Sequence, residues 1–289
     1  MSYRRLRITA DNPAWHDAFF AHVAEVFPGI DFRRWGALGG WDAGYDVLAL
    51  AEADRVVASI GRTRMTLVVE GQETGGYQLG AVATRGSRRG QGMARRLMQE
   101  VLAEADREAC PVFLFANPTV LDFYPRFGFQ RMVQSRFGVD AAIMPAAGRA
   151  RAFNSGDARE RRRLAELCGR AAPTGRRFGA RAYYSILLWH ICNRPLAAHW
   201  LDAEEALIVT GCEADRLILH DVVAPRAFDL ATVLPAVAAA ATRSVEFAFE
   251  PGAWWPGARP LGGDDALLFV RGLGTPPAAP FRFPDLAQT

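Results

Sequence analysis

Hydrophobic and polar positions follow two periodicities along the first half of the chain, one helical and one typical of strands. Apolar residues recur at helical spacing over Pro13–Phe27 and over Met93–Ala109, and each stretch predicts an amphipathic helix. Between these helices the pattern alternates or runs apolar over short segments, which predicts antiparallel strands over Val47–Glu52, Val56–Arg64 and Thr66–Glu70. The pattern therefore predicts an α/β fold in which a twisted, mixed sheet is flanked by helices.

A basic loop with two glycines follows the apolar strand Leu79–Thr84 and opens directly onto the second predicted helix. Gly90 and Gly92 allow the backbone to approach a ligand closely, because they carry no Cβ. The free N–H groups of the first helical turn, together with the helix dipole, can then hold an anion. Three basic side chains add positive charge beside this turn: Arg85, Arg88 and Arg89. The segment predicts a cradle for a pyrophosphate group.

The spacing of this loop differs from that of the two commonest nucleotide-binding loops. A P-loop requires a lysine, and the chain contains none; a dinucleotide fingerprint requires a third glycine where Arg95 stands. The loop instead resembles the R-x-x-G-x-[G/A] signature of the GNAT family of N-acetyltransferases, with the residues Arg89, Gly90, Gln91, Gly92, Met93 and Ala94. In that family the backbone amides of the signature hold the pyrophosphate of acetyl-coenzyme A (acetyl-CoA).

A second signature follows at the family's spacing. Val112–Ala116 predicts a short buried strand, Asn117-Pro118 predicts a helix start, and Tyr124 precedes Gly128-Phe129 by four residues. The order of these features is that of the GNAT family: strand, loop, helix, strand, asparagine, tyrosine and Gly-Phe. The resemblance covers residues 1 to about 140 and implies the acyl-CoA N-acyltransferase-like fold.

The resemblance also implies roles for individual residues. Tyr124 inherits the role of proton donor to the departing sulfur, which a phenol of pKa about 10 can perform for a thiol of about 8.5. A backbone amide of the signature strand would take the thioester carbonyl, which places Val82, Ala83 and Thr84 at the cofactor. Asn117 either contacts the cofactor or caps the next helix, and the two roles are compatible. The alternative for Tyr124 is a half-buried aromatic that only packs.

No general base emerges from the sequence. Neither Leu79–Thr84 nor Val112–Ala116 carries a carboxylate or a histidine. Five carboxylates elsewhere are expected to be solvated surface charges, namely Glu25, Asp31, Glu70, Glu73 and Asp122. A base from the second half of the chain, or a chain of water molecules, is equally open.

The second half of the chain repeats the order of the first in a weaker form, after a small, basic linker at Ala146–Arg151. Helical and strand patterns are predicted at Ser155–Ala172, Ala182–Cys192, Ala206–Gly211, Arg216–Val223, Phe228–Thr242, Val245–Phe249 and Ala266–Arg271, and Phe129–Val139 is expected to be the last strand of the first half. We therefore expect a GNAT acetyltransferase domain over residues 1–145 and a degenerate GNAT-like domain over residues 151–289. The loop Ala224–Phe228 has no glycine pair, and Pro225 removes an amide, so the second unit is not expected to bind coenzyme A.

Composition narrows the function classes only a little. The longest uncharged apolar runs are too short to span a membrane, no signal peptide is recognised, and a net charge of +3 does not favour nucleic acid. Four cysteines without metal-binding spacing are expected to be buried free thiols in a cytoplasmic protein, and no metal is expected. His190, His199 and the pair Trp254-Trp255 are expected to pack, although the tryptophans could line an acceptor site.

The sequence thus predicts an acetyl-CoA-dependent N-acetyltransferase that transfers the acetyl group directly to the amine of a small molecule. A glycine-rich aromatic segment with Trp35, Trp41 and Tyr45 would suit the acceptor pocket. A longer acyl-CoA or a hydroxyl acceptor remains an alternative within the same fold. A non-catalytic coenzyme A-binding sensor or scaffold is the alternative from another class. GNAT-like proteins often dimerise, so a homodimer is also open.

Overall fold

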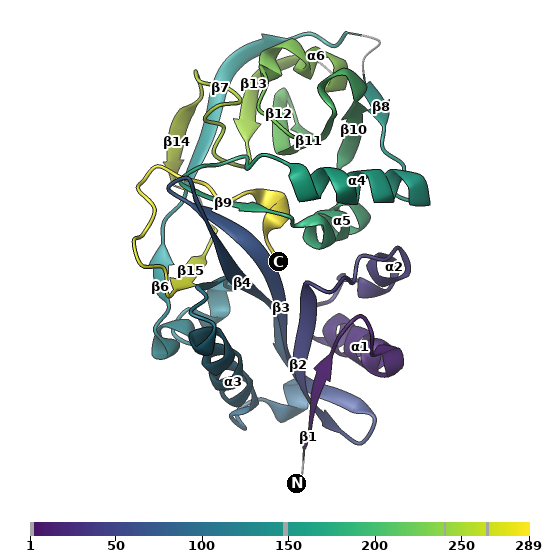
Figure 1. Ribbon diagram of the computed structural model, residues 1–289, viewed down its shortest axis with the longest axis vertical. Helices are drawn as coiled ribbons and strands as arrows, with labels where there is room; N and C mark the ends of the chain where they lie inside the picture. The colour runs from purple at the N-terminus through teal and green to yellow at the C-terminus, as the bar shows by residue number, and fades with distance from the viewer. Residues whose placement is uncertain (1–2, 147–149, 240, 264–265) are drawn as a thin grey trace.

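The computed structural model describes residues 3–146, 150–239, 241–263 and 266–289 of the 289-residue chain. The chain forms two lobes, each built around its own sheet, and the lobes are stacked along the long axis of the molecule (Figure 1). The predicted α/β fold with mixed sheets is confirmed, and the two sheets are consistent with a duplicated fold.

The first sheet holds the signature strand at its centre. Its strands follow the spatial order β1 (Arg4–Ile8), β2 (Tyr45–Glu52), β3 (Arg55–Val69), β4 (Gln72–Thr84), β5 (Val112–Phe115), β15 (Leu268–Arg271) and β6 (Gln130–Met132). Only β4 and β5 pair in parallel among these neighbours, and β9 (Phe178–Arg181) pairs with β3 in addition. One strand, β3, replaces the two strands predicted over residues 56–70, because its pairing with β4 continues from Ala58 to Val69.

Both faces of the first sheet are covered, which explains why β2 is apolar at consecutive positions. Val47 and Ala49 pack with α1 (His16–Val26) and α2 (Phe32–Ala37), whereas Leu48 and Leu50 pack with α3 (Met93–Arg107). Successive side chains of a strand point to opposite faces, so α3 lies on one face of the sheet and α1 and α2 on the other. The 3-10 turn η1 (Pro13–Trp15) leads into α1.

The second sheet has a similar plan. Its strands follow the order β14 (Arg259–Gly263), β7 (Ser135–Ile143), β13 (Thr242–Phe247), β12 (Arg216–Val223), β11 (Ala206–Glu213), β10 (Ala197–Leu201) and β8 (Ala150–Ala152). The β11–β12 pair forms the predicted hairpin, and β13 runs parallel to β12. Three helices belong to this half: α4 (Ala158–Arg170), α5 (Tyr184–Asn193) and α6 (Leu234–Val237).

Two strands join the sheet of the other half, which corrects the predicted strand plan. Phe129–Val139 is not one strand, because the chain leaves the first sheet after β6 and enters the second as β7. At this crossing Gln134 is fully buried, and its Oε1 accepts a hydrogen bond of 2.7 Å from Phe283 N. The final strand β15 inserts between β5 and β6 of the first sheet. The two sheets therefore do not divide at one point of the chain, and the predicted domain division stays a prediction.

The predicted helix over Phe228–Thr242 is also wrong. Only the short turn η6 (Leu230–Thr232) and the four-residue α6 form there. Leu230, Val233 and Leu234 are all buried, so packing holds these short turns in place. The backbone becomes extended at Ala238, and Thr242 begins β13.

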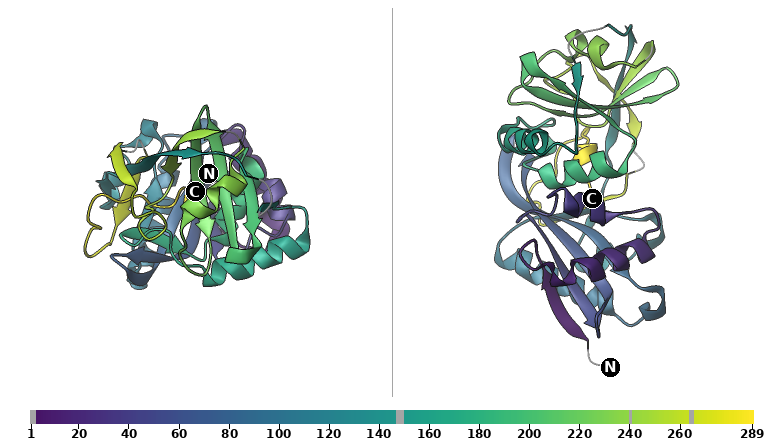
Figure 2. Two further views of the ribbon diagram at one scale, coloured as in Figure 1. Left: turned by 90° about the horizontal axis from the view of Figure 1, so that it is seen from above. Right: turned by 90° about the vertical axis from the view of Figure 1, so that its right-hand side faces the viewer.

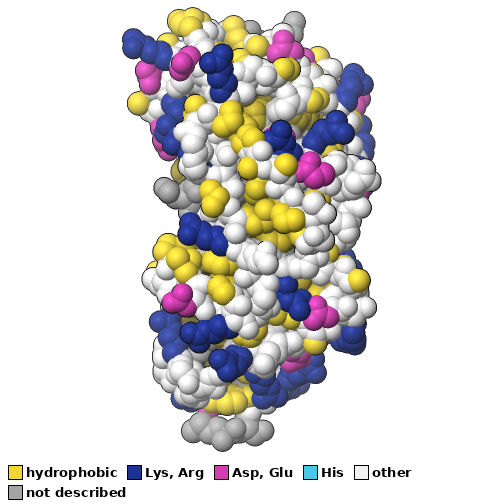
Figure 3. All heavy atoms as spheres, turned by 90° about the vertical axis from the view of Figure 1, so that its left-hand side faces the viewer, with side chains coloured by type: hydrophobic (Ala, Val, Ile, Leu, Met, Phe, Trp, Pro, Cys, Tyr) yellow, Lys and Arg dark blue, Asp and Glu magenta, His cyan; other side chains and the backbone are white. Residues whose placement is uncertain are grey.

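Helix α5 fills the junction of the lobes (Figure 2). Its Leu187 packs in the cluster that joins the two sheets, and its Leu188 packs with α1 and α2. On the face in Figure 3, hydrophobic side chains gather at the waist, and arginines are numerous over the lower lobe. No helix among the described residues is both long and apolar enough to cross a membrane. All four cysteines are free, but Cys212 is exposed and Cys110 is partly exposed, so the prediction of buried thiols is confirmed only for Cys168 and Cys192.

Candidate functional site

A bulge interrupts the signature strand β4. Two residues, Ala81 and Val82, face the single residue Ile60 of β3, because the register shifts between Ser59↔Ala83 and Gly61↔Gly80. Ala81 adopts a left-handed backbone conformation with φ of +45°, and Ser59 Oγ donates a hydrogen bond of 2.8 Å to its carbonyl. The bulge therefore re-aims the backbone in the middle of the predicted cofactor-binding strand.

The bulge lies where β4 and β5 part. Their parallel pairing runs only from Tyr77↔Val112 to Leu79↔Leu114, although β4 continues to Thr84. Within the part of the chain that the structure describes, the edge of β4 beyond Leu79 has no neighbouring strand on the β5 side, so its backbone groups are available to a ligand. The open backbone lies in the strand where the resemblance places the thioester carbonyl.

The loop predicted to be the cradle has a left-handed backbone at both of its glycines. Gly90 and Gly92 both adopt left-handed conformations, with φ of +76° and +74°, and a Cβ at either would meet open space. Gly92 is the N-cap of α3, where no side chain caps the helix and no acidic residue occupies the first turn. The positive end of a 15-residue helix therefore faces an open loop, which suits an anion.

The three basic side chains beside the cradle have different surroundings. Arg85 is buried, where it forms an ion pair with Glu25 and donates to Val56 O at 2.7 Å. Arg88 forms an ion pair with Glu52. Arg89 is exposed and forms no ion pair within the described structure, donating only a long hydrogen bond of 3.4 Å to Thr84 O. The expectation that all three add free charge is therefore corrected to Arg89 alone.

Tyr124 is buried at the start of the 3-10 turn η4 (Tyr124–Phe127). Its ring packs against Phe123, Phe129 and Phe269, at centroid distances of 5.3, 6.0 and 5.7 Å. Burial raises the pKa of the Tyr124 hydroxyl to about 12, so the phenol stays protonated at neutral pH. The predicted helix around it is replaced by two 3-10 turns, η3 (Pro118–Val120) and η4.

Asn117 caps the turn η3, as one of its two predicted roles requires. Its Oδ1 accepts hydrogen bonds from Thr119 N and Thr119 Oγ1, both at 2.9 Å. The side chain is exposed and also lines the cavity described next.

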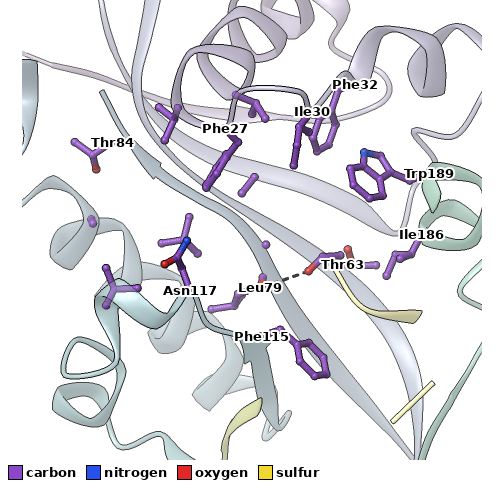
Figure 4. Close-up of a pocket in the computed structure, with 18 of the residues that line it drawn as sticks. Phe27, Ile30, Phe32, Thr63, Leu79, Thr84, Phe115, Asn117, Ile186 and Trp189 are labelled. Carbon is purple, nitrogen blue, oxygen red and sulfur yellow. Dashed lines mark hydrogen bonds between the residues drawn. The ribbon is translucent and has the colours of Figure 1, made fainter. Parts of the chain in front are cut away.

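A cavity of about 710 Å³ joins these features (Figure 4). One end lies along the signature strand and the start of α3, with Val82, Thr84, Arg89, Ala94, Asn117 and Tyr124 on its walls. The other end, which we call the aromatic end, is walled by Phe27, Ile30, Phe32, Trp35, Ile186 and Trp189. In Figure 4 Thr84 and Asn117 lie on the side opposite Trp189 and Ile186.

The structure thus brings six predicted site residues onto one cavity and leaves five off its walls. Ala83 is buried and pairs with Ser59 of β3. The Met93 side chain is buried in the core between α3 and the first sheet. The remaining three are on the exposed cradle loop: Gly90, Gln91 and Gly92. The Gln91 side chain accepts a hydrogen bond of 3.0 Å from Tyr3 Oη.

Several wall residues were not found from the sequence. Ser185, Ile186 and Trp189 come from α5, which lies far beyond both signatures in the chain, and no local motif marks them. Thr289 also lines the cavity, and its Oγ1 lies 3.4 Å from Leu79 O. A Cβ at Gly80 would lie 2.6 Å from that Oγ1, so a glycine is required for this close approach.

The five carboxylates considered above in the search for a general base are not among the residues that line the cavity. Glu25 pairs with Arg85, Glu73 pairs with Arg181, Asp31 caps α2, and Glu70 accepts a hydrogen bond from Ala278 N. Asp122 is exposed. Among the described residues, the cavity walls carry one charged side chain, Arg89, and no carboxylate or imidazole side chain.

The histidine and the aromatic residues discussed in the sequence analysis either pack in the core or line the cavity. Trp254 is buried in the core of the second lobe, away from this cavity. His190 is buried, and its Nε2 lies 2.7 Å from Gln288 O. Of the aromatic segment, Trp35 and Tyr45 line the cavity, whereas Trp41 packs among their rings.

Comparison with known families adds an independent finding. The family described as "Acetyltransferase (GNAT) domain" matches residues 12–132. This part of the first lobe is thus similar to a GNAT acetyltransferase domain. The match spans α1 to β6 and includes the bulge, the cradle and Tyr124. Comparison with curated protein sequences finds no match.

Several solved structures share the fold of nearly the whole chain. A GCN5-related N-acetyltransferase from Kribbella flavida gives a TM-score of 0.58 at 18% identity, covering 93% of this chain and 70% of that chain. Eis1 from Mycobacterium abscessus gives a TM-score of 0.60 at 14% identity, covering 93% of this chain and 73% of that chain. A conserved protein from Enterococcus faecalis V583, described as a probable N-acyltransferase, gives a TM-score of 0.60 at 13% identity, covering 94% of this chain and 72% of that chain. The fold and the GNAT domain together support acyl transfer as the general chemistry.

Proposed function

We propose that the protein is an N-acetyltransferase that moves an acetyl group from acetyl-CoA directly to the amine of a small molecule. The observation that carries the proposal is the parting of β4 from β5 at the Ala81 bulge. The parting opens the cavity that Tyr124 and the first turn of α3 both line. A thioester in this gap would have backbone donors on one side and a protonated phenol on another.

The cofactor end supplies the contacts that a coenzyme A pyrophosphate needs. The first-turn amides of α3 and the backbone of Gly90–Gly92 would hold the anion, with the guanidinium of Arg89 beside them. Asn117 would face the pantetheine arm from the opposite wall. The backbone of Val82, or of a neighbouring residue, would donate to the thioester carbonyl, on which negative charge develops.

Transfer balances without a covalent enzyme intermediate. The amine nitrogen forms a bond to the carbonyl carbon, the C–S bond breaks, and the Tyr124 hydroxyl passes its proton to the departing sulfur. The nitrogen then loses one proton to water, and the Tyr124 phenolate regains one. The net products are the acetylated amine and the free thiol of coenzyme A, and Tyr124 returns to its starting state.

The test is an assay of acetyl-CoA with a panel of primary amines. Thiol release reports turnover, and mass spectrometry of the amine distinguishes transfer from hydrolysis. We expect acetylated product that depends on both substrates. Tight binding of acetyl-CoA without transfer to any amine would contradict the proposal and favour a coenzyme A-binding sensor.

A further inference from the structure

The aromatic end of the cavity carries information about the acceptor. Its walls come from the end of α1, the following segment, α2 and α5, so both halves of the chain build it (Figure 4). We propose that the acceptor is an apolar monoamine with an aromatic body, which lies in this end. The inference rests on the proposed function and names its substrate class.

The side-chain charges of the walls disfavour a polycation. Arg89, the one charged side chain among the described lining residues, lies at the cofactor end and repels a cation. An acceptor with several ammonium groups would therefore bury charges without a partner, which is strongly unfavourable. An acceptor whose only basic group is the reacting amine avoids that cost.

The shape of the aromatic end is fixed before a ligand binds. Trp35 Nε1 donates a hydrogen bond of 2.9 Å to Ser185 O, and Ser185 Oγ donates one of 2.7 Å to Gly40 O. These bonds join α2 and the segment that follows it to α5. Phe32 packs between the two tryptophans, with its ring centroid 5.4 Å from that of Trp35 and 6.1 Å from that of Trp189. A preformed aromatic wall favours a flat, aromatic ligand, because ring pairs add to the gain from burial.

A buried hydroxyl distinguishes an amine from a long acyl chain as the occupant. Thr63 lines the cavity and is 4% exposed, and its Oγ1 has no hydrogen-bond partner among the described residues. Buried hydroxyls in proteins nearly always have a partner, so the occupant is expected to supply a polar atom. An amine N–H can donate to Thr63 Oγ1, whereas the methylene chain of a longer acyl group cannot.

The first experiment compares 2-phenylethylamine and tryptamine with spermidine as acceptors for acetyl-CoA. We expect kcat/KM to be at least about tenfold higher for the two aromatic amines, the scale on which apolar pockets discriminate. Equal or faster acetylation of spermidine would overturn the inference while leaving the proposed function intact.

The second experiment changes the charge of the wall. Ile30 is partly exposed on the segment between α1 and α2, so Ile30→Glu places a carboxylate at the aromatic end with little loss of packing. We expect this variant to lose about tenfold in kcat/KM for 2-phenylethylamine and to gain for spermidine. Val133→Glu is the matched control, because Val133 is 65% exposed and is not among the residues that line the cavity. An unchanged preference in Ile30→Glu would contradict the inference.

The third experiment separates the acceptor from the acyl chain and needs no turnover. Calorimetric titration of 2-phenylethylamine into protein saturated with free coenzyme A measures acceptor binding alone. We expect Trp189→Ala and the isosteric Thr63→Val to weaken this binding about tenfold and to leave coenzyme A binding unchanged. If Trp189→Ala instead changes only the preference among acetyl-, butyryl- and hexanoyl-CoA, the aromatic end holds the acyl chain and the inference is wrong. Amine binding without any transfer would support the acceptor site and contradict the proposed catalysis.

Discussion

At the scale of single residues, the site depends on two groups whose surroundings suit their proposed tasks. Tyr124 is a phenol whose pKa is raised to about 12 by burial among aromatic rings, so it carries its proton at any physiological pH. Arg89 is an exposed guanidinium beside the open N-terminus of α3, while its neighbours Arg85 and Arg88 are neutralised by glutamates. One residue is thus suited to give a proton and the other to hold an anion.

Tyr124→Phe tests the proposed acid. The variant keeps the ring and its aromatic contacts but removes the transferable proton. We expect kcat to fall about 100-fold or more, the scale of general acid catalysis, while the Kd for acetyl-CoA stays within about twofold. Steady-state kinetics and calorimetry measure the two quantities. Full activity in the variant would show that Tyr124 only packs.

Arg89→Ala tests the charged part of the cradle. Loss of one charge-assisted contact to a phosphate is expected to weaken acetyl-CoA binding about tenfold. Arg88→Ala is the matched control, because its guanidinium is held by Glu52, and its Kd should change much less. Equal losses in the two variants would mean that the loop binds the cofactor by general attraction rather than through Arg89.

At the scale of elements, the last turn of the chain is anchored to the second half of the chain. The 3-10 turn η7 (Asp285–Ala287) lies against α5 and β12, and Asp285 Oδ2 lies 2.8 Å from both Arg194 Nη1 and His220 Nδ1. Burial would raise the pKa of Asp285, but the hydrogen bond from His220 and the charge of Arg194 outweigh it and hold the pKa well below its usual range. This anchor places the side chain of Thr289 on the cavity wall.

Asp285→Asn tests that anchor. Removing the charge leaves Arg194 without its carboxylate, so we expect a loss of about 2 kcal/mol in the free energy of unfolding and a raised KM for the amine. Urea denaturation and steady-state kinetics provide the readouts. Asp106→Asn serves for comparison, because its ion pair with Arg271 is largely exposed and should contribute less than about 1 kcal/mol. An unchanged free energy of unfolding in Asp285→Asn would show that this carboxylate does not anchor the last turn.

The elements also show what the sequence could and could not predict. Contiguous patterns predicted the cradle, α3 and the position of Tyr124, because each depends on residues close together in the chain. The bulge at Ala81 has no local signal, since it arises from the register against β3. The wall supplied by α5 depends on packing between the two halves, so neither Ile186 nor Trp189 could be assigned in advance.

At the scale of the whole molecule, buried titratable groups couple stability to pH. The pKa of His22 and that of His190 are each lowered to about 4, mainly by burial and further by the charges of Arg85 and Arg194. Both rings are therefore neutral in the folded state where the unfolded chain takes up protons, between about pH 6.5 and 4. Asp221 acts in the opposite sense, because burial raises its pKa to about 7, so the folded state holds an extra proton between about pH 4 and 7.

These shifts predict the slope of stability against pH. Between pH 6.5 and 5 the two histidines give the unfolded state up to two more protons and Asp221 gives the folded state one, so stability falls as the pH is lowered. Each net proton corresponds to about 1.4 kcal/mol per pH unit. We expect His190→Gln to flatten the slope of the unfolding free energy and Asp221→Asn to steepen it, as measured by urea denaturation at several pH values. Identical slopes in all three proteins would contradict these assignments.

The exchange of strands between the sheets also belongs to this scale, and it lay beyond the sequence. The strand patterns near Val139 and Leu268 are visible in the chain, but nothing in them states which sheet they join. The order of patterns in the second half suggested a repeat of the first, and the parallel β12–β13 pair after a hairpin is consistent with it. A degenerate second copy nevertheless remains a prediction about the origin of this lobe.

The most direct test of the central claim is calorimetric titration of the protein with acetyl-CoA, beside the variants Gly92→Asp and Gly39→Asp. Both glycines have similar positive φ angles and open surroundings, but only Gly92 caps α3, where a carboxylate would repel the pyrophosphate. We expect micromolar binding at one site per chain, abolished in Gly92→Asp and retained in Gly39→Asp. Two sites per chain, or binding that survives Gly92→Asp, would contradict a single cradle at the start of α3.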